Sequence, residues 1–266
     1  MTSDAPAEAD GTTGRFTTTR WSLILSSFAA QSDDEKAREA LAQLCRLYWR
    51  PIFAFICRKG YSVPDAQDLT QDFFMLIVSG DLLRHADRAR GRFRSLLLET
   101  LQNFLIDAHR ISHARKRGGD VEFISWEAWM AEAPSYLSVP ATAIDEWPAE
   151  KLFDVRWAAT VAEQALRRMS EECELHGRRR LFDVLSGALT AEREDVSYAT
   201  LASELGMEET KIKKLLHQMR QRYRQLLRAE VAETIENPDD IDEELRYLCA
   251  ALAAGNQQLG TDRSIG

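Results

Sequence analysis

Between Tyr198 and His217 the sequence has the pattern of two helices joined by a tight turn. Ala202 is small where the second helix must approach closely, and Gly206 stands where the chain needs a left-handed backbone conformation. Ser197 precedes the first helix and is expected to cap it by accepting a hydrogen bond from a free backbone N–H. The shared core would consist of Leu201, Leu205, Ile212 and Leu215. This pattern predicts a helix-turn-helix, although Ala and Gly at this spacing also occur in ordinary helical hairpins.

The second helix of this pair continues to about Leu226, with an apolar stripe on one side and a basic surface on the other. Seven Lys and Arg and no acid occur from Lys211 to Arg228, which gives a net charge of +7. In a DNA major groove, such a helix would present its first exposed residues to base edges and its later arginines to phosphates. The predicted DNA-contacting residues are Glu209, Thr210, Lys213, Lys214, His217, Arg220, Gln221 and Arg224.

Apolar residues recur with helical spacing along most of the chain, and no segment shows the alternation of a strand. Helices are expected over about 21–28, 37–57, 65–78, 92–115, 152–174 and 179–189. Pro51 should kink or restart the second of these helices, and Ser62 to Asp65 are typical of a turn with a helix start. The predicted fold class is therefore all-α.

Acids, prolines and aromatics break the helical pattern between about 120 and 148. The aromatics in this stretch are Trp126, Trp129, Tyr136 and Trp147, too many for a freely solvated tether, so parts of it should dock. The sequence thus predicts two helical domains joined by an acidic, aromatic-containing linker. The predicted units are a disordered tail over 1–15, a helical domain over 16–118, the linker over 119–151, a helix-turn-helix domain over 152–235 and an acidic extension over 236–266.

The net charge of −8 conceals a segregation of sign along the chain. Residues 84–117 hold nine basic and three acidic side chains, a net +6, in addition to the +7 of the second basic segment. Residues 120–154 and 229–266 each carry −7. Two basic segments between acidic ones favour contacts with nucleic acid, and solvated helix faces are the alternative.

Four dispersed cysteines, with no metal-binding or redox spacing, are typical of reduced thiols in a cytoplasmic protein. Neither a signal peptide nor a membrane span fits the sequence, and no membrane partner is expected. His109 and His113 have a metal-compatible spacing near Asp107, which would fit a metal-dependent nuclease. A third ligand is not evident, and the adjacent arginines would repel a cation. We therefore expect no enzyme activity, no metal and no cofactor.

Three stretches of this sequence are similar to sigma factors of bacterial RNA polymerase. They are residues 65–73, residues 93–110 and residues 197–228. Together they resemble the sigma-70 family, extracytoplasmic-function type, over about residues 16–117 and 152–235. The resemblance implies an alternative sigma factor that directs the polymerase core to specific promoters and helps to open them. A stand-alone helix-turn-helix regulator is the alternative function.

The resemblance assigns roles to residues of each stretch. Residues that would bind the polymerase clamp are Asp65, Asp68, Gln71 and Asp72. Those that would contact the opened −10 element are Arg92, Phe93, Arg94, Asn103, Asp107 and Arg110, and the helix-turn-helix residues given above would read the −35 element. Partners would be the clamp and flap of the polymerase core, promoter DNA, and an anti-sigma factor or other regulator.

Two positions depart from the family pattern. Leu96 stands where Trp is common, and Glu208 stands where Ser is common at the start of the recognition helix. Arginines beside aromatics suit melted DNA, although Phe93 and Phe104 also fit a protein core. Residues 239–248 predict a short amphipathic acidic helix, which would either cover the basic surface or lie on the protein as a plain surface helix.

Overall fold

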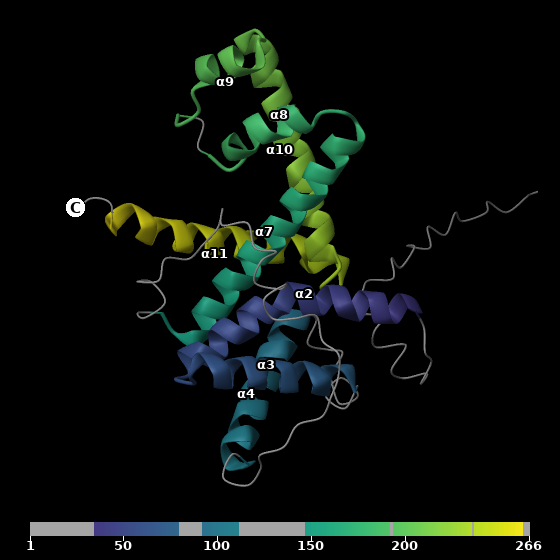
Figure 1. Cartoon of the computed structure of the whole chain (residues 1–266), viewed down its shortest axis with the longest axis vertical. Helices are drawn as coiled ribbons and strands as arrows, with labels where there is room; N and C mark the ends of the chain where they lie inside the picture. The colour runs from purple at the N-terminus through teal and green to yellow at the C-terminus, as the bar shows by residue number, and fades with distance from the viewer. Residues whose placement is uncertain (1–34, 80–91, 112–146, 192–193, 236, 263–266) are drawn as a thin grey trace, which may run out of the picture.

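The computed structural model describes residues 35–79, 92–111, 147–191, 194–235 and 237–262 (Figure 1). In this part of the chain every regular element is a helix, so the all-α prediction is confirmed. The only β-type pairing among these residues is an isolated bridge between Arg92 and Ile235. The tail 1–15, the helix expected over 21–28 and the aromatics Trp126, Trp129 and Tyr136 lie outside the described residues.

The elements follow one another along the chain with short connections inside each described range. They are α2 (Glu35–Arg58), α3 (Val63–Val78), α4 (Phe93–Ile111), α7 (Ala149–Leu175), α8 (Arg179–Leu185), η3 (Ser186–Ala188), α9 (Tyr198–Leu205), α10 (Glu209–Ala232), η4 (Pro238–Asp240) and α11 (Ile241–Asp262). Within the described ranges, no helix is long and apolar enough to cross a membrane.

The first core is formed by α2, α3, α4 and the first half of α7. It is rich in aromatic rings, because these large side chains fill the space between crossing helices. Tyr48 and Phe93 meet edge to face with centroids 5.1 Å apart, and Tyr48 and Phe153 stack at 6.4 Å. Each of these three side chains is buried.

Local sequence signals explain how α2 and α3 form. Ser62 caps α3 by accepting a hydrogen bond from the Asp65 N–H at 3.3 Å, and Pro64 lies in the first turn, so the predicted helix start is confirmed. The prediction of a restart at Pro51 is wrong, because α2 continues through this residue without a break. Pro51 is buried, and packing of α2 against α3 and α7 holds the helix on both sides of it.

The second core contains the other half of α7 with α8, η3, α9 and α10. Ala165 and Met169 of α7 pack with Leu185, Ile212 and Leu216, all of them buried. In Figure 1 this core lies at one end of the long axis of the molecule, and α2, α3 and α4 lie at the other end.

Two helices belong to both cores. The first half of α7 packs in the first core through Phe153, Trp157 and Val161, and its second half packs in the other. The end of α10 likewise reaches the first core through Val231. The helix predicted to start at about 152 begins at Ala149, and it packs against α2.

Trp147 shows how one predicted linker aromatic docks. Its ring is buried and packs with Leu152 and Val155, against Ala54 of α2 and Ala251 of α11. The Trp147 carbonyl accepts a hydrogen bond from the Arg58 side chain at 2.5 Å. The expectation that parts of the linker dock is confirmed at this residue.

The acidic extension forms α11, which lies across α7 between the two cores in Figure 1. Leu248 is fully buried, while Ile241 and Leu245 are partly buried against the first core. The predicted amphipathic helix is therefore confirmed, and it extends farther than the sequence pattern indicated, to Asp262.

Candidate nucleic-acid interface

The helix-turn-helix is formed by α9 and α10, with Gly206 between them. Gly206 has φ 63° and ψ 38°, the left-handed conformation that the sequence predicts there. The Met207 N–H donates to the Ala202 carbonyl at 3.0 Å, and the Gly206 N–H donates to the Ser203 carbonyl at 3.3 Å. These bonds close the end of α9, and buried Ala202 lets α10 approach.

The predicted cap at Ser197 is wrong. Its side chain makes no capping bond to a backbone N–H, and its Oγ lies instead 2.8 Å from Oγ1 of Thr200. Glu208, at the start of α10, has no capping hydrogen bond through its side chain either. Both helices of the motif thus begin without a side-chain cap, so packing against the second core stabilises their first turns.

The outer surface of α10 carries the residues predicted to read DNA, and we call five of them the recognition face. Its members are Glu209, Thr210, Lys213, Lys214 and His217, and all five side chains are exposed. The opposite side of the helix is buried in the second core through Ile212, Leu216 and Met219. Burial of one stripe therefore fixes which side chains of α10 point outward.

Lys213 is oriented by two neighbours. Its Nζ lies 3.5 Å from Oε2 of Glu209, one helical turn away, and 5.1 Å from the ring centroid of Tyr198 on α9. Both contacts are solvent-exposed, so each is weak and a phosphate or base can displace it.

The three later predicted contacts do not all share this exposure. Gln221 and Arg224 are exposed, whereas Arg220 is half-buried. Arg220 Nη2 donates to the carbonyls of Ala188 at 2.7 Å and Ala191 at 2.8 Å. Arg220 therefore holds the segment containing Ala188 and Ala191, which precedes α9, against α10.

A second ion pair fixes α10 on its far side. The Arg222 Nη2 lies 2.5 Å from Oε1 of Glu172 on α7, and its Nε lies 2.8 Å from Oε2. This bidentate contact lowers the pKa of Glu172 and raises that of Arg222, because each charge stabilises the other.

The polymerase-binding residues predicted on α3 lie together on one exposed surface. The structure leaves the side chains of Asp65, Asp68, Gln71 and Asp72 exposed, while Ala66, Phe73 and Ile77 of the same helix are buried. Partial burial, with the nearby charge of Asp68, raises the pKa of Asp72. The surface is acidic and one-sided, as a helix docking on a basic partner requires.

The residues predicted to hold opened DNA divide into two groups on α4. Asn103 and Asp107 are exposed beside Ile106, whose side chain is 53% exposed. The other group, Phe93 and Arg94, is buried at the start of the helix, so neither offers free surface in this conformation. The side chain of Arg110 lies outside the described residues.

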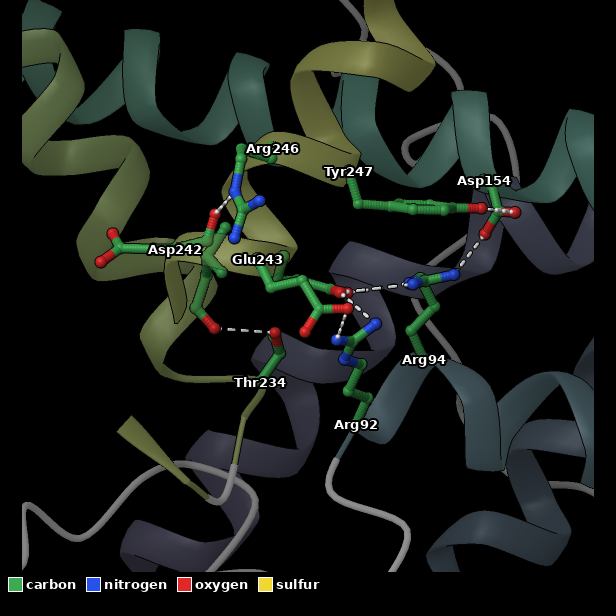
Figure 2. A network of polar contacts seen from close by, with 10 residues as sticks. Arg92, Arg94, Asp154, Thr234, Asp242, Glu243, Arg246 and Tyr247 are labelled. Atoms are coloured by element: carbon green, nitrogen blue, oxygen red, sulfur yellow. Dashed lines mark hydrogen bonds and ion pairs between the residues drawn. The ribbon is translucent and has the colours of Figure 1, made fainter. Parts of the chain in front are cut away.

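Arg92 and Arg94, which we call the arginine pair, point toward carboxylates of α11 (Figure 2). Arg92 Nη2 lies 2.6 Å from Oε1 of Glu243, and its Nη1 lies 3.5 Å from Oε2 of Glu244. Arg94 contacts Glu244 and also Asp154 of α7, with Nη1 2.7 Å from Oδ1. Hydrogen bonding to Glu243 is the main cause that raises the pKa of Arg92.

Aromatic rings flank the Arg94 guanidinium. Its Cζ lies 4.1 Å from the ring centroid of Tyr247 on α11 and 5.2 Å from that of Trp157 on α7. The Tyr247 hydroxyl donates to Asp154, as Figure 2 also shows. Burial, with this hydrogen bond to Asp154, raises the pKa of Tyr247 to about 12.

Sequence reasoning missed the partners of the arginine pair. Asp154, Trp157 and Tyr247 carry no local signal, because each lies in an ordinary helical pattern far from α4 in the chain. The acidic charge of 229–266 was the available signal for Glu243 and Glu244, but charge alone did not identify which residues meet.

The metal-site hypothesis gains no support from the described residues, among which no group of three or more His, Cys, Asp or Glu is arranged to hold an ion. The side chains of His109 and His113 lie outside them. Comparisons of the chain with protein-family models, with curated proteins and with solved structures found no match.

Proposed function

We propose that this protein is an alternative sigma factor of the sigma-70 family, extracytoplasmic-function type, acting on promoter DNA with RNA polymerase in the cytoplasm. The observation that carries the proposal is the recognition face. The turn at left-handed Gly206 and the buried Ala202 position α10 so that the glutamate, threonine, lysine and histidine side chains of this face are exposed together. Side chains of these types can donate to and accept from the base edges of a DNA major groove.

The acidic surface of α3 supports the second part of the proposal. A subunit that reads promoters for a polymerase needs a surface for the enzyme that is separate from its DNA-binding surfaces. One helix provides exposed side-chain oxygens at four positions, and none of these four side chains is basic. They are Asp65, Asp68, Gln71 and Asp72. We infer that this row binds the clamp, while the helix-turn-helix domain contacts the flap.

The proposed mechanism divides DNA recognition between two helices. Lys213, Lys214 and His217 of α10 anchor the upstream duplex by groove and phosphate contacts. Residues of α4, among them Asn103 and Arg110, then hold the opened strand near the start site. The chain itself supplies binding and positioning, and the polymerase carries out nucleotide addition.

Transcription in vitro tests this proposal directly. Core polymerase with the full chain should initiate at discrete positions on fragments of the source genome, and core alone should not. Placing positive charge on the acidic surface of α3, with Asp68→Lys and Gln71→Lys, should abolish initiation and co-purification with the core while leaving the circular dichroism spectrum unchanged. Failure to initiate on every genomic fragment would contradict the proposal.

A stand-alone regulator is the second candidate, and one observation favours it. In this conformation the recognition face is exposed, whereas the start of α4 is occupied by α11. A regulator using α10 alone would bind a palindromic site tightly as a dimer without polymerase. Sedimentation of the chain with and without selected DNA distinguishes the two candidates.

A further inference from the structure

The start of α4 is covered by segments from the other end of the chain. The Phe93 N–H donates to the Thr234 carbonyl at 3.2 Å, just after α10. From α11, Glu243 contacts Arg92, and both residues are labelled in Figure 2. Glu244 contacts both arginines. The part of the predicted DNA surface at the start of α4 is therefore already occupied, whereas Asn103 and Asp107 farther along the helix are exposed.

The groups that occupy it share the chemistry of a nucleotide. Glu244 binds Arg94 through two oxygens, Oε1 at 2.9 Å from Nε and Oε2 at 3.3 Å from Nη2, which is also the way a guanidinium binds phosphate. The Tyr247 ring lies over the same guanidinium at 4.1 Å, where an unstacked base would lie. α11 therefore presents a carboxylate and an aromatic ring together to the Arg94 guanidinium.

The contact between α11 and the arginine pair is partly exposed to solvent on the side of Arg92 and Glu243, where a phosphate could begin to replace a carboxylate. Glu243 is 60% exposed and Arg92 is 24% exposed, whereas Glu244 is 1% exposed. A phosphate can therefore compete first for Arg92 and later for Arg94. The apolar side of α11 that must separate consists, among the described side chains, of buried Leu248 and partly buried Ile241, Leu245, Ala251 and Leu252.

We propose that α11 is an intramolecular competitor of single-stranded DNA, holding Arg92 and Arg94 until α11 is displaced. This inference rests on the proposed function, since it assigns the arginine pair to opened promoter DNA. It makes the free protein a weak binder of single strands. α10 ends at Ala232 and α11 begins at Ile241, so docking of the helix-turn-helix on the polymerase would act close to α11 along the chain.

The test measures binding of the free full-length chain to a fluorescein-labelled single strand of mixed sequence, by anisotropy over a range of salt concentrations. Wild type is compared with Glu243→Gln/Glu244→Gln. We expect at least about tenfold tighter binding for the variant, and a salt slope steeper by about 0.7 to 1.4, since each phosphate contact of a single strand contributes about 0.7 and Arg94 keeps its ion pair with Asp154. Adding Arg92→Ala/Arg94→Ala to the variant should abolish the gain.

The matched control is Asp239→Asn/Asp240→Asn. It removes the same charge from the same extension, at two acids of η4, whereas Glu243 and Glu244 are the α11 acids that contact the arginine pair. An equal gain in the control would overturn the proposal, because net charge alone would then explain the binding. Unchanged binding of a folded Glu243→Gln/Glu244→Gln variant would also overturn it.

Glu243→Gln alone keeps the test valid if loss of buried Glu244 prevents folding. Glu243 is largely exposed, so its replacement leaves the Arg94 pair in place and removes the shorter of the two carboxylate contacts of Arg92, which keeps Glu244 at 3.5 Å. This variant should steepen the salt slope by up to about 0.7. A fully wild-type slope would overturn the proposal.

Failure of this inference is separable from failure of the proposed function. Wild-type protein that supports promoter-dependent initiation, together with α11 variants that bind single strands no better, would leave the sigma factor intact and reject α11 as competitor. Tighter binding by the α11 variants without any initiation would support the competition and reject the sigma factor.

Discussion

Arg94 and Glu244 lie 150 positions apart in the sequence and form a buried, bidentate ion pair that joins α4 to α11. Their side chains are 8% and 1% exposed. Burial lowers the pKa of Arg94, but the hydrogen bond and charge of Glu244 outweigh that effect, so the net shift is upward. The Arg94 guanidinium therefore stays charged in the folded protein. The stability of the fold then depends on the carboxylates that pair with this buried charge.

Removing Glu244 should destabilise the fold strongly. Glu244→Ala leaves a buried guanidinium with Asp154 alone, and we expect a loss of about 3–5 kcal/mol in the free energy of unfolding. Asp242→Ala, which removes a carboxylate from the exposed pair with Arg228, should leave the free energy of unfolding almost unchanged. Urea denaturation followed by circular dichroism measures both, and similar losses for the two variants would contradict the prediction.

The recognition face should account for much of the salt dependence of promoter binding. Lys213→Ala/Lys214→Ala removes two exposed cations, so the slope of log affinity against log salt should fall by about 1.8, at about 0.9 per phosphate of duplex DNA. Arg222→Ala on the same helix is the control, since its charge is paired with Glu172 on α7. Electrophoretic mobility shifts of holoenzyme on a promoter found in vitro provide the measurement. An unchanged slope for the double variant would exclude DNA reading by this face.

Gly206 should be sensitive to substitution because of its backbone alone. A Cβ at this position meets nothing within 4 Å, but φ is 63°, where an L side chain costs about 1–2 kcal/mol. Gly187→Ala is the matched control, because its Cβ also meets nothing within 4 Å and it has no positive φ. We expect thermal denaturation to show a lower midpoint for Gly206→Ala only. A comparable decrease in both variants would refute this explanation.

The four thiols should differ in reactivity. Cys249 on α11 is exposed, whereas burial raises the pKa of Cys45 to about 12, so almost none of Cys45 is thiolate at neutral pH. Mass spectrometry of an iodoacetamide time course should find Cys249 alkylated first and Cys45 last. In urea the order should disappear, and a fast Cys45 in the folded chain would contradict the described packing of α2.

Local signals in the sequence were sufficient for the motif but insufficient for its surroundings. Gly206, Ala202 and Pro64 each act within one helical turn, so their structural roles follow from neighbouring residues. Ser197 does not cap α9, and its hydroxyl lies instead within hydrogen-bonding distance of the Thr200 hydroxyl. The helix does not restart at Pro51, because α2 packs against α3 and α7 as one helix.

Charge patterning could not distinguish an external counter-charge from an internal one. A basic segment containing Arg92 and Arg94 has the same composition whether phosphate or Glu244 neutralises it. Contacts between such distant positions depend on how α7 and α11 cross, and that geometry is set by packing in the first core. Periodicity gives the buried side of a helix and leaves its neighbour undetermined.

The continuity of α7 has a mechanical consequence for the whole molecule. Its 27 residues extend about 40 Å at about 1.5 Å per residue, and its two halves are embedded in different cores. Unfolding of either half of α7 would remove side chains that pack in the other core. Both cores should therefore unfold together in one cooperative thermal transition. A calorimetric trace would then contain one peak, and partly melted molecules would be scarce at its midpoint.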